Sequence, residues 1–216
     1  MTGFWAAVPV KEFGGAKQRL AGLLTPTQRQ ALAAAMLEDV LAALSAAPLA
    51  GIMVNTLDAM ATELASRFGA RIITSGARDG HSGAVAAMAH ILAEESAVGM
   101  LTCPGDIPGV TADEAAGLLA QHAAAPAFTI VPAHDARGSN AVLLSPPDLL
   151  PLRFGNDSFM PHLEAARQHG LAPTVLRFPG FALDIDNPQD ARDFLRSGLG
   201  EHTNSIALLR RFLGAS

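Results

Sequence analysis

The sequence predicts a single-domain, three-layer α/β/α fold with a mostly parallel sheet. Three observations lead to this expectation. Short apolar runs alternate with longer amphipathic or alanine-rich segments along nearly the whole chain. Glycine, proline and capping residues separate these segments at regular intervals. The chain has 216 residues, of which 50% are hydrophobic, so it is long and apolar enough to bury a substantial core.

The first half of the chain predicts three strands separated by two helices. The first strand is expected over residues 4–10, an apolar run followed by a pair of glycines. Thr25, Pro26 and Gln28 supply a cap, a proline at the first helical position and a capping-box partner, so they start a long helix. That helix ends before Pro48. The next elements are a strand at 51–55, a helix at 57–68 and a strand at 70–74.

The second half continues the alternation and ends in a tail. Thr111 with Glu114 predicts a capped helix start, and Asn187 with Pro188 predicts another. Residues 1–197 are expected to form the domain. Residues 198–216 form a tail, in which a mobile connection leads to an amphipathic helix at 206–213 that docks on the domain or on a second subunit. The other expected elements are helices at 84–95 and 159–169 and strands at 98–102, 128–131, 141–144 and 175–178.

Composition narrows the function classes. The net charge of -5 argues against a broadly basic nucleic-acid surface. No apolar run is long enough to span a bilayer and no basic leader precedes the first strand, so we expect a cytoplasmic protein without a membrane partner. Cys103 is the only cysteine, which excludes an intrachain disulfide framework.

The loop after the first strand is the first candidate site. Lys11 and Lys17 are the only lysines of the chain, and both fall in this loop beside Gly14 and Gly15. Glycines let backbone amides approach a ligand, and the cations would neutralise phosphates, so a triphosphate would suit the loop. The sequence matches neither the P-loop nor the dinucleotide-binding pattern. The alternative is a surface turn with solvated cations.

Three aspartates form the second candidate site. Asp106 directly follows an apolar strand, where a carboxylate at the sheet edge can hold Mg²⁺ between phosphates. Asp184 and Asp186 are separated by one residue, so extended backbone would place both side chains on one face, within reach of one ion or two. The alternatives are an aspartate that stabilises a proline-rich turn and a pair that caps the helix at Pro188, although Asn187 already fills that cap position.

Two polar loops are candidates for binding a phosphate or carboxylate. The loop at 137–140 contains Ser139 and Asn140, and the loop at 154–159 leads into a helix whose first amides can receive an anion. Ser158 is interpreted as the N-cap of that helix, a ligand-binding residue, or both. His162 is interpreted as a packing or hydrogen-bonding residue, and Cys103 as a small buried residue, so neither is included among the catalytic candidates.

Taken together, these motifs resemble the phospholactate guanylyltransferases of coenzyme F420 biosynthesis. The resemblance covers roughly residues 6 to 195, and the ordered combination of motifs is more specific than any one of them. The motifs are V-P-V-K and A-K-x-R-L in the first loop, A-M-L-E-D-V-L, G-D-I-P, G-S-N-A-V-L-L, F-G-N-D-S-F-M-P-H and D-I-D-N-P-Q-D.

The resemblance implies a glycosyltransferase-A-like nucleotidyltransferase fold. It also implies an enzyme that transfers GMP from GTP to 2-phospholactate, phosphoenolpyruvate or 3-phosphoglycerate and releases pyrophosphate. Mg²⁺ is the implied cofactor, and Lys17 and Asp106 are the implied catalytic residues. The implied metal ligands are Asp106, Asp184 and Asp186; the nucleotide-binding residues are Val8, Val10, Gly14, Gly15, Lys17, Gly83 and Asp106; and the acceptor-binding residues are Ser139, Asn140, Gly155 and Ser158.

Two positions depart from the family pattern. Ser139 stands where a threonine is usual, which keeps the hydroxyl, and Val85 stands where an asparagine is usual, which leaves the choice of base open. One alternative is therefore an enzyme of the same fold that uses another nucleoside triphosphate with a sugar or cofactor phosphate. Another is a catalytically idle nucleotide-binding protein. A homodimer is also possible.

Overall fold

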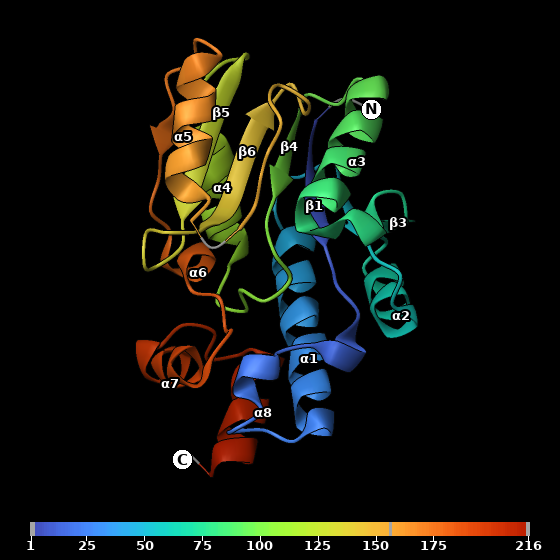
Figure 1. The fold of residues 1–216 in the computed structure, drawn as a ribbon, viewed down its shortest axis with the longest axis vertical. Coiled ribbons are helices and arrows are strands. Elements are labelled where there is room, and N and C mark those ends of the chain that lie inside the picture. The colour runs from blue at the N-terminus through green and yellow to red at the C-terminus, as the bar shows by residue number, and fades with distance from the viewer. Residues whose placement is uncertain (1–2, 156, 215–216) are drawn as a thin grey trace.

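In the computed structural model, which describes residues 3–155 and 157–214, the chain is built around one seven-stranded sheet (Figure 1). The strand order is β3-β2-β1-β4-β6-β5-β7. The α/β fold predicted from the alternating pattern is confirmed. The strands are β1 (Phe4–Pro9), β2 (Gly51–Asn55), β3 (Arg71–Ile73), β4 (Gly99–Thr102), β5 (Ala127–Pro132), β6 (Ser139–Ser145) and β7 (Thr174–Val175).

Strand β6 runs against the direction of its two neighbours. It pairs antiparallel with β4 and β5, whereas the pairings β1/β2, β1/β4, β2/β3 and β5/β7 are parallel. Its first residues, Ser139 and Asn140, therefore lie at the same edge as the carboxyl ends of β1 and β4. The sequence predicted Ser139 and Asn140 in a loop before the strand, whereas they are the first residues of β6, and its reversed direction brings them to this edge.

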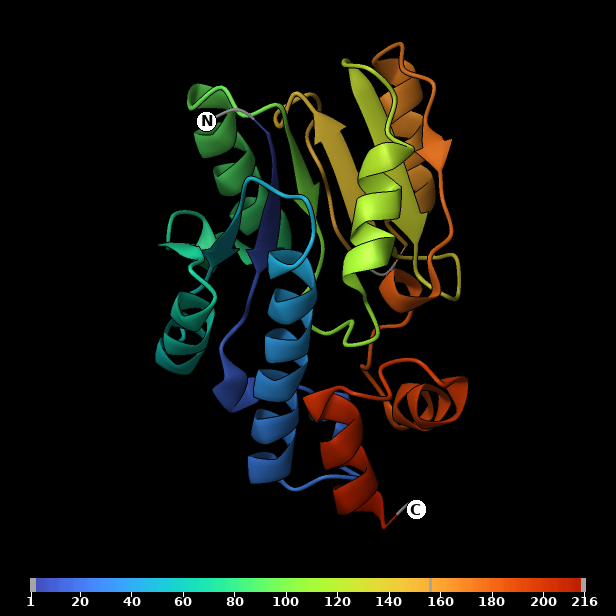
Figure 2. The same ribbon diagram turned by 180° about the vertical axis from the view of Figure 1, so that it is seen from behind.

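Helices cover both faces of the sheet. Helices α3 (Gly80–Glu94) and α5 (Phe159–Gln168) lie on one face, and α1 (Pro26–Ser45) and α4 (Ala112–Ala120) lie on the other, as the two opposite views show (Figures 1 and 2). The remaining helices are α2 (Ala59–Arg67), α6 (Pro179–Ala182), α7 (Pro188–Ser197) and α8 (Asn204–Leu213), with short 3-10 turns η1 (Phe13–Gly15), η2 (Gln18–Leu20) and η3 (Ala77–Asp79).

The predicted capping motifs start three of these helices. Thr25 and Gln28 form the reciprocal capping box of α1, and Asn187 forms one with Asp190 in α7. At α4 the Thr111 side chain accepts a hydrogen bond from the Glu114 backbone amide, as expected. The Glu114 carboxylate instead accepts a hydrogen bond from the amide of Gly180, which joins α4 to α6.

The core has two layers because successive strand residues point to opposite faces of the sheet. In β1, Ala6 and Val8 pack in the layer that contains α1, whereas Ala7 packs in the layer that contains α3. The largest fully buried side chains include Phe128, Phe181 and Phe194. Burying each such ring contributes roughly 2–3 kcal/mol, so packing on the two faces fixes the strands whose ends carry the polar loops.

Helix α3 begins at Gly80, although the sequence predicted its start at residue 84. Gly83, which the resemblance assigned to nucleotide binding, lies within the first turn of the helix. A Cβ atom at Gly83 would overlap the side chain of Asp79 in the preceding η3 turn. The glycine therefore permits close packing of η3 against α3 rather than marking a break.

Helix α8 docks on α1. Its side chains Ile206 and Leu209 are buried in the same core as α1. The Asp39 carboxylate of α1 accepts hydrogen bonds from the backbone amides of Asn204 and Ser205, each at 2.9 Å, and so caps the first turn of α8. Among the described residues, no helix has the length and apolar character needed to cross a membrane.

Candidate active site

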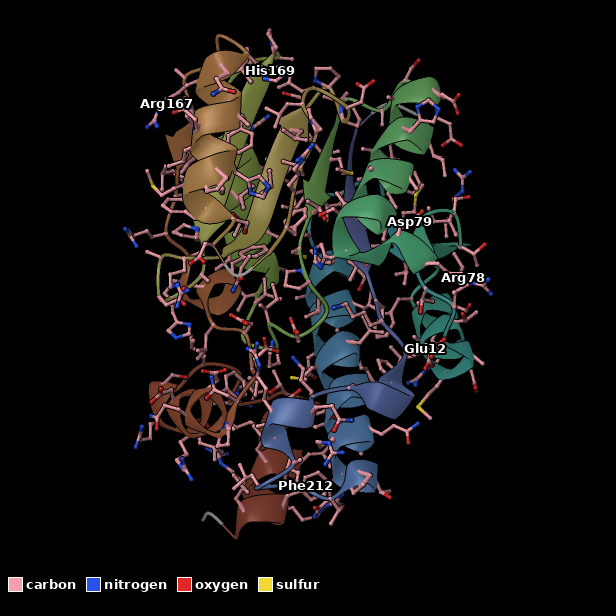
Figure 3. The ribbon with its side chains drawn as sticks, viewed as in Figure 1. Glu12, Arg78, Asp79, Arg167, His169 and Phe212 are labelled. Atoms are coloured by element: carbon pink, nitrogen blue, oxygen red, sulfur yellow. The ribbon has the colours of Figure 1, made fainter. Side chains whose placement is uncertain are left out.

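A cleft of about 1400 Å³ opens at the carboxyl edge of the sheet. Its walls come from the loop after β1, the loop after β4, the start of β6, the loop before α5 and the segment between α6 and α7. Glu12 and Arg78, labelled in Figure 3, lie on two of the segments that line it, the loop after β1 and the η3 turn. The predicted site residues on this lining are Val10, Gly15, Lys17, Asp106, Ser139, Asn140, Gly155, Ser158, Asp184 and Asp186.

Three predicted nucleotide-binding residues are not among the described residues that line the cleft. Val8 is fully buried in the core, and Gly83 packs in the first turn of α3. Gly14 lies in the η1 turn, where a Cβ atom would meet nothing within 4 Å. Val85, whose identity left the base choice open, is 1% exposed and packs in the core layer beneath α3. Val85 is therefore not among the described residues that line the cleft.

Lys17 connects two of the predicted acids. Its Nζ lies 2.6 Å from Asp106 Oδ2 and 2.7 Å from Asp186 Oδ1. The backbone of Lys17 has φ 53°, in the left-handed region that ordinarily costs about 1 kcal/mol or more for a side-chain-bearing residue. Burial alone would lower the pKa of Lys17, but the two carboxylates raise it above its usual value. The ammonium is thus held charged between two loops that are far apart in the sequence.

Asp184 and Asp186 differ in charge environment although only Ile185 separates them. Burial raises the pKa of Asp184, and the negative charges of Asp106 and Asp186 raise it further, while a 3.0 Å hydrogen bond from Asn140 Nδ2 opposes this. For Asp186 burial acts in the same direction, but Lys17 lowers its pKa below the usual value. Asp186 is thus ion-paired with Lys17, whereas Asp184 accepts a hydrogen bond from Asn140 but has no ion-pair partner among the described residues.

The three acids suit a cation, although they are not arranged as a ready ligand set. In the described part of the chain, no group of three or more acidic, histidine or cysteine side chains has a metal-binding arrangement, and Lys17 lies between two of the predicted ligands. Two features favour a further positive charge. Asp106 Oδ1 is buried and has no hydrogen-bond partner among the described residues. Burial and the negative charges of Asp106 and Asp186 also raise the pKa of Asp184, so a positive charge beside these acids would be stabilised.

Opposite the acids, two serines form a hydrogen-bonded pair. Ser158 Oγ accepts a hydrogen bond from the Ser139 amide at 3.1 Å and lies 3.2 Å from Ser139 Oγ. His162 Nδ1 lies 3.0 Å from Ser139 Oγ. Ser158 occupies the expected N-cap position of α5, but its side chain makes no capping hydrogen bond. The hydroxyl is engaged instead by the start of β6, a long-range contact that the local sequence does not indicate.

The loop before α5 is fastened to α3 as well. The Phe154 amide donates a hydrogen bond of 2.9 Å to Ser82 Oγ, and the Phe154 ring lies between the rings of His81 and His162, with centroid distances of 4.3 Å and 5.0 Å. These contacts hold the loop that carries Gly155 on the cleft. Asn156 of the same motif lies outside the described residues.

Sequence reasoning missed two polar groups beside the cleft. A recess of about 30 Å³ continues it toward the end of β2 and is lined by Asn55 and His81, among others. Asn55 Oδ1 and His81 Nε2 are buried, with no hydrogen-bond partner in the described structure. Burial lowers the pKa of His81 to about 4, so its ring is neutral near pH 7. Both groups are available to hydrogen-bond a ligand.

The interpretation of Cys103 as a small buried residue is confirmed. The side chain is 2% exposed, and burial raises the pKa of its thiol to about 12. A thiol with so high a pKa is not a nucleophile near neutral pH.

His162 predicts a measurable pH dependence of stability. Burial, and then the nearby His81 ring, lower its pKa from 6.5 to about 4, and only 2% of the residue is exposed. The unfolded chain binds this proton more readily than the folded protein does. The protonation of His162 therefore does not change the free energy of unfolding above pH 6.5, and it lowers that free energy as pH falls toward 4. Between pH 7 and pH 5 we expect a loss of about 2 kcal/mol from this group.

Urea unfolding of the wild type and of His162→Asn at the two pH values checks this expectation. The variant should lose about 2 kcal/mol less than the wild type between pH 7 and pH 5. Equal losses in the two proteins would show that His162 is protonated alike in the folded and unfolded states.

Comparisons with known proteins agree with the fold. The family model described as "Guanylyl transferase CofC like" matches residues 5–213. A phosphoenolpyruvate guanylyltransferase from Rubrobacter xylanophilus is 37% identical over 197 residues, which cover 90% of this chain and 94% of that protein. A 2-phospho-L-lactate guanylyltransferase from Methanothermobacter thermautotrophicus is 33% identical over 208 residues, covering 96% and 91%. The solved structure of a nucleotidyl transferase from the same genus has a TM-score of 0.60 at 18% identity, covering 91% of this chain and 99% of that one.

Proposed function

The chain belongs to the guanylyl transferase CofC-like family, and on this premise we propose that it transfers GMP from GTP to a small phosphorylated three-carbon acid. The observation that carries the proposal is the arrangement of the cleft. The Lys17 ammonium, with Asp106 and Asp186, faces it from the loops after β1, after β4 and after α6. Ser139, at the start of β6, and Ser158, in the loop before α5, form a hydrogen-bonded pair that also lines the cleft. A phosphate chain and a second anion would each find complementary groups in one cavity.

The two substrates would occupy different parts of the cleft. The loop at 10–19 contributes the cations Lys11, Lys17 and Arg19 and is proposed to bind the triphosphate. Ser139, Asn140, Gly155 and Ser158 are proposed to bind the phosphate or carboxylate of the acid. A volume of about 1400 Å³ is ample for both ligands together.

Mg²⁺ is the proposed cofactor, held by Asp106, Asp184 and Asp186. Two observations support this assignment: Asp106 Oδ1 has no hydrogen-bond partner among the described residues, and the negative charges of Asp106 and Asp186 raise the pKa of Asp184. Bound there, Mg²⁺ would hold phosphate oxygens and neutralise the charge that develops during transfer. Lys17 would remain beside the acids as a second, fixed positive charge.

The proposed chemistry requires no protein nucleophile. An oxygen of the acceptor phosphate attacks the α-phosphorus of GTP, the bond from that phosphorus to the bridging oxygen of the β-phosphate breaks, and pyrophosphate leaves with the electron pair. The acceptor phosphate is already ionised near neutral pH, so no residue has to remove a proton from it. Lys17 stabilises the charge on the departing pyrophosphate, and the cleft walls align the reacting atoms.

A cytoplasmic role in coenzyme F420 biosynthesis completes the proposal. The relatives named as guanylyltransferases for phosphoenolpyruvate and 2-phospho-L-lactate support it. The homodimer stays a prediction.

A panel of substrates tests the function. The protein is incubated with Mg²⁺, each of the four common nucleoside triphosphates, and phosphoenolpyruvate, 2-phospholactate, 3-phosphoglycerate or a sugar phosphate, and the products are identified by mass. We expect pyrophosphate and a guanosine diphosphate-linked acid only when GTP and one of these acids are both present. A product from another triphosphate with a sugar phosphate would replace the proposal with a different nucleotidyltransferase. GTP binding without any product would identify an idle nucleotide-binding protein.

A further inference from the structure

His162 is a buried histidine that the proposed reaction does not use, yet it contacts the acceptor side of the cleft. We infer that His162 is a positioning residue: it holds the Ser139 and Ser158 hydroxyls so that one O–H of the pair is presented to the acceptor as a hydrogen-bond donor. The inference rests on the proposed function only in naming the acceptor as the ligand.

The first step is the position of the proton on the His162 ring. The backbone amide of Arg153 donates a hydrogen bond to His162 Nε2 at 3.0 Å. A backbone N–H can only donate, so Nε2 must be the unprotonated nitrogen. The neutral ring then carries its proton on Nδ1, which donates it to Ser139 Oγ at 3.0 Å. The main chain of a neighbouring residue thus fixes the tautomer.

The second step counts the donors and acceptors of the serine pair. Ser139 Oγ accepts from His162, and Ser158 Oγ accepts from the Ser139 amide at 3.1 Å. One further hydrogen bond joins the two hydroxyls over 3.2 Å. Whichever serine donates in that bond, the proton of the other hydroxyl remains unused. Both serines line the cleft, so the pair can offer this remaining O–H to a ligand there.

The third step is that His162 acts through Ser139 rather than on the ligand. His162 is 2% exposed and is not among the described residues that line the cleft. Its ring packs edge to face against Phe154, the residue before Gly155. The histidine thus connects the start of β6, the loop before α5 and α5 itself at one point. A donor held by such a network is oriented before the acceptor arrives, which lowers the entropic cost of binding.

The chemistry of this end of the cleft favours an anion that only accepts hydrogen bonds. A phosphate or carboxylate oxygen fits the free O–H. Without the His162 donor, nothing would fix the direction of the Ser139 hydroxyl, so its proton would no longer be held toward the cleft before the acceptor arrives. The expected consequence is weaker acceptor binding with little change in GTP binding.

Two variants test the inference. His162→Phe removes both ring nitrogens, whereas His162→Asn keeps an N–H group near the position of Nδ1. The matched control is His122→Phe, because His122 also bridges two hydroxyls, Thr129 Oγ1 and Ser145 Oγ, each at 2.8 Å, but does not line the cleft. Steady-state kinetics with GTP and each acid that the wild type uses give the KM for each substrate, and thermal unfolding reports folding.

We expect the acceptor KM of His162→Phe to rise by roughly tenfold to a hundredfold, as for a lost hydrogen bond to a charged group, with the KM for GTP within about threefold of wild type. His162→Asn should recover a large part of the loss, and His122→Phe should leave both KM values unchanged. An unchanged acceptor KM in His162→Phe, or equal losses in the two His162 variants, would overturn the inference.

A spectroscopic measurement on the free wild-type protein is independent of activity. Nitrogen-detected NMR of the histidine rings at pH 7 should show His162 neutral, with the proton on Nδ1 and none on Nε2. A proton on Nε2 would overturn the inference even in an active enzyme. A wild type that turns over none of the three acids would instead overturn the proposed function, so the two failures are distinguishable.

Discussion

Replacing Asp106 by asparagine is expected to lower guanylyl transfer by roughly a thousandfold or more while the protein stays folded. Asparagine keeps the volume of the side chain and removes its charge. The lost carboxylate is the one that pairs with Lys17 at 2.6 Å and whose Oδ1 has no partner among the described residues. Both the proposed cation site and the alignment of Lys17 would be affected. Initial rates at saturating GTP and acceptor measure the loss.

The fold should tolerate this change. The Asp106 carbonyl accepts a hydrogen bond from the Ile185 amide at 3.1 Å, and that backbone contact is independent of the side chain. Asp193→Asn is the matched control, since Asp193 is an exposed carboxylate of α7 that pairs with Arg196 away from the cleft lining. Full activity of Asp106→Asn would remove this residue from the reaction, and with it the proposed cation site.

Replacing Lys17 by methionine is expected to lower activity by roughly a hundredfold or more. Methionine keeps most of the length of the side chain but not its charge. Asp106, Asp184 and Asp186 would then face one another with no ammonium between them, and the leaving pyrophosphate would lose its fixed positive charge. Since Asp186 owes its lowered pKa to Lys17, its pKa should rise in the variant.

Lys11 supplies the control for this prediction because it is the only other lysine and lines the same cleft. It is exposed, and Lys11→Met should raise the KM for GTP by no more than about tenfold with kcat little changed. Rates and KM values of the two methionine variants separate a specific role of Lys17 from a general need for positive charge in the loop. Equal effects of the two changes would contradict the specific role.

Local sequence patterns were sufficient to predict most of the fold. The Thr25 and Gln28 capping box, the Asn187 cap and the short apolar strands all depend on residues close together in the chain. No local sequence pattern indicates that β6 runs antiparallel, because the direction of a strand depends on the neighbours with which it pairs. The early start of α3 was missed because Gly83 reads as a breaker unless its contact with Asp79 is known.

The candidate site was also predicted only in part, because some of its contacts join residues that are far apart in the sequence. Asp106 was expected at the carboxyl edge of the sheet because it follows β4, whereas its grouping with Asp186, which follows α6, came from the family resemblance. The ion pair of Lys17 with Asp186 joins residues 169 positions apart, and the contact of His162 with Ser139 joins residues 23 apart. The one signal for His162 was its spacing of one helical turn from Ser158.

The docking of α8 makes the C-terminal end of the chain part of the catalytic framework. Ala33, Met36 and Leu37 of α1 line the cleft, while Asp39, about half a turn further along the same helix, anchors α8. A purification tag fused after residue 216, or a deletion of the last helix, would disturb the packing of α8 on α1, the helix that lines one side of the cleft. Kinetic comparisons between engineered forms of this enzyme should therefore keep that end native and place any addition before the first strand.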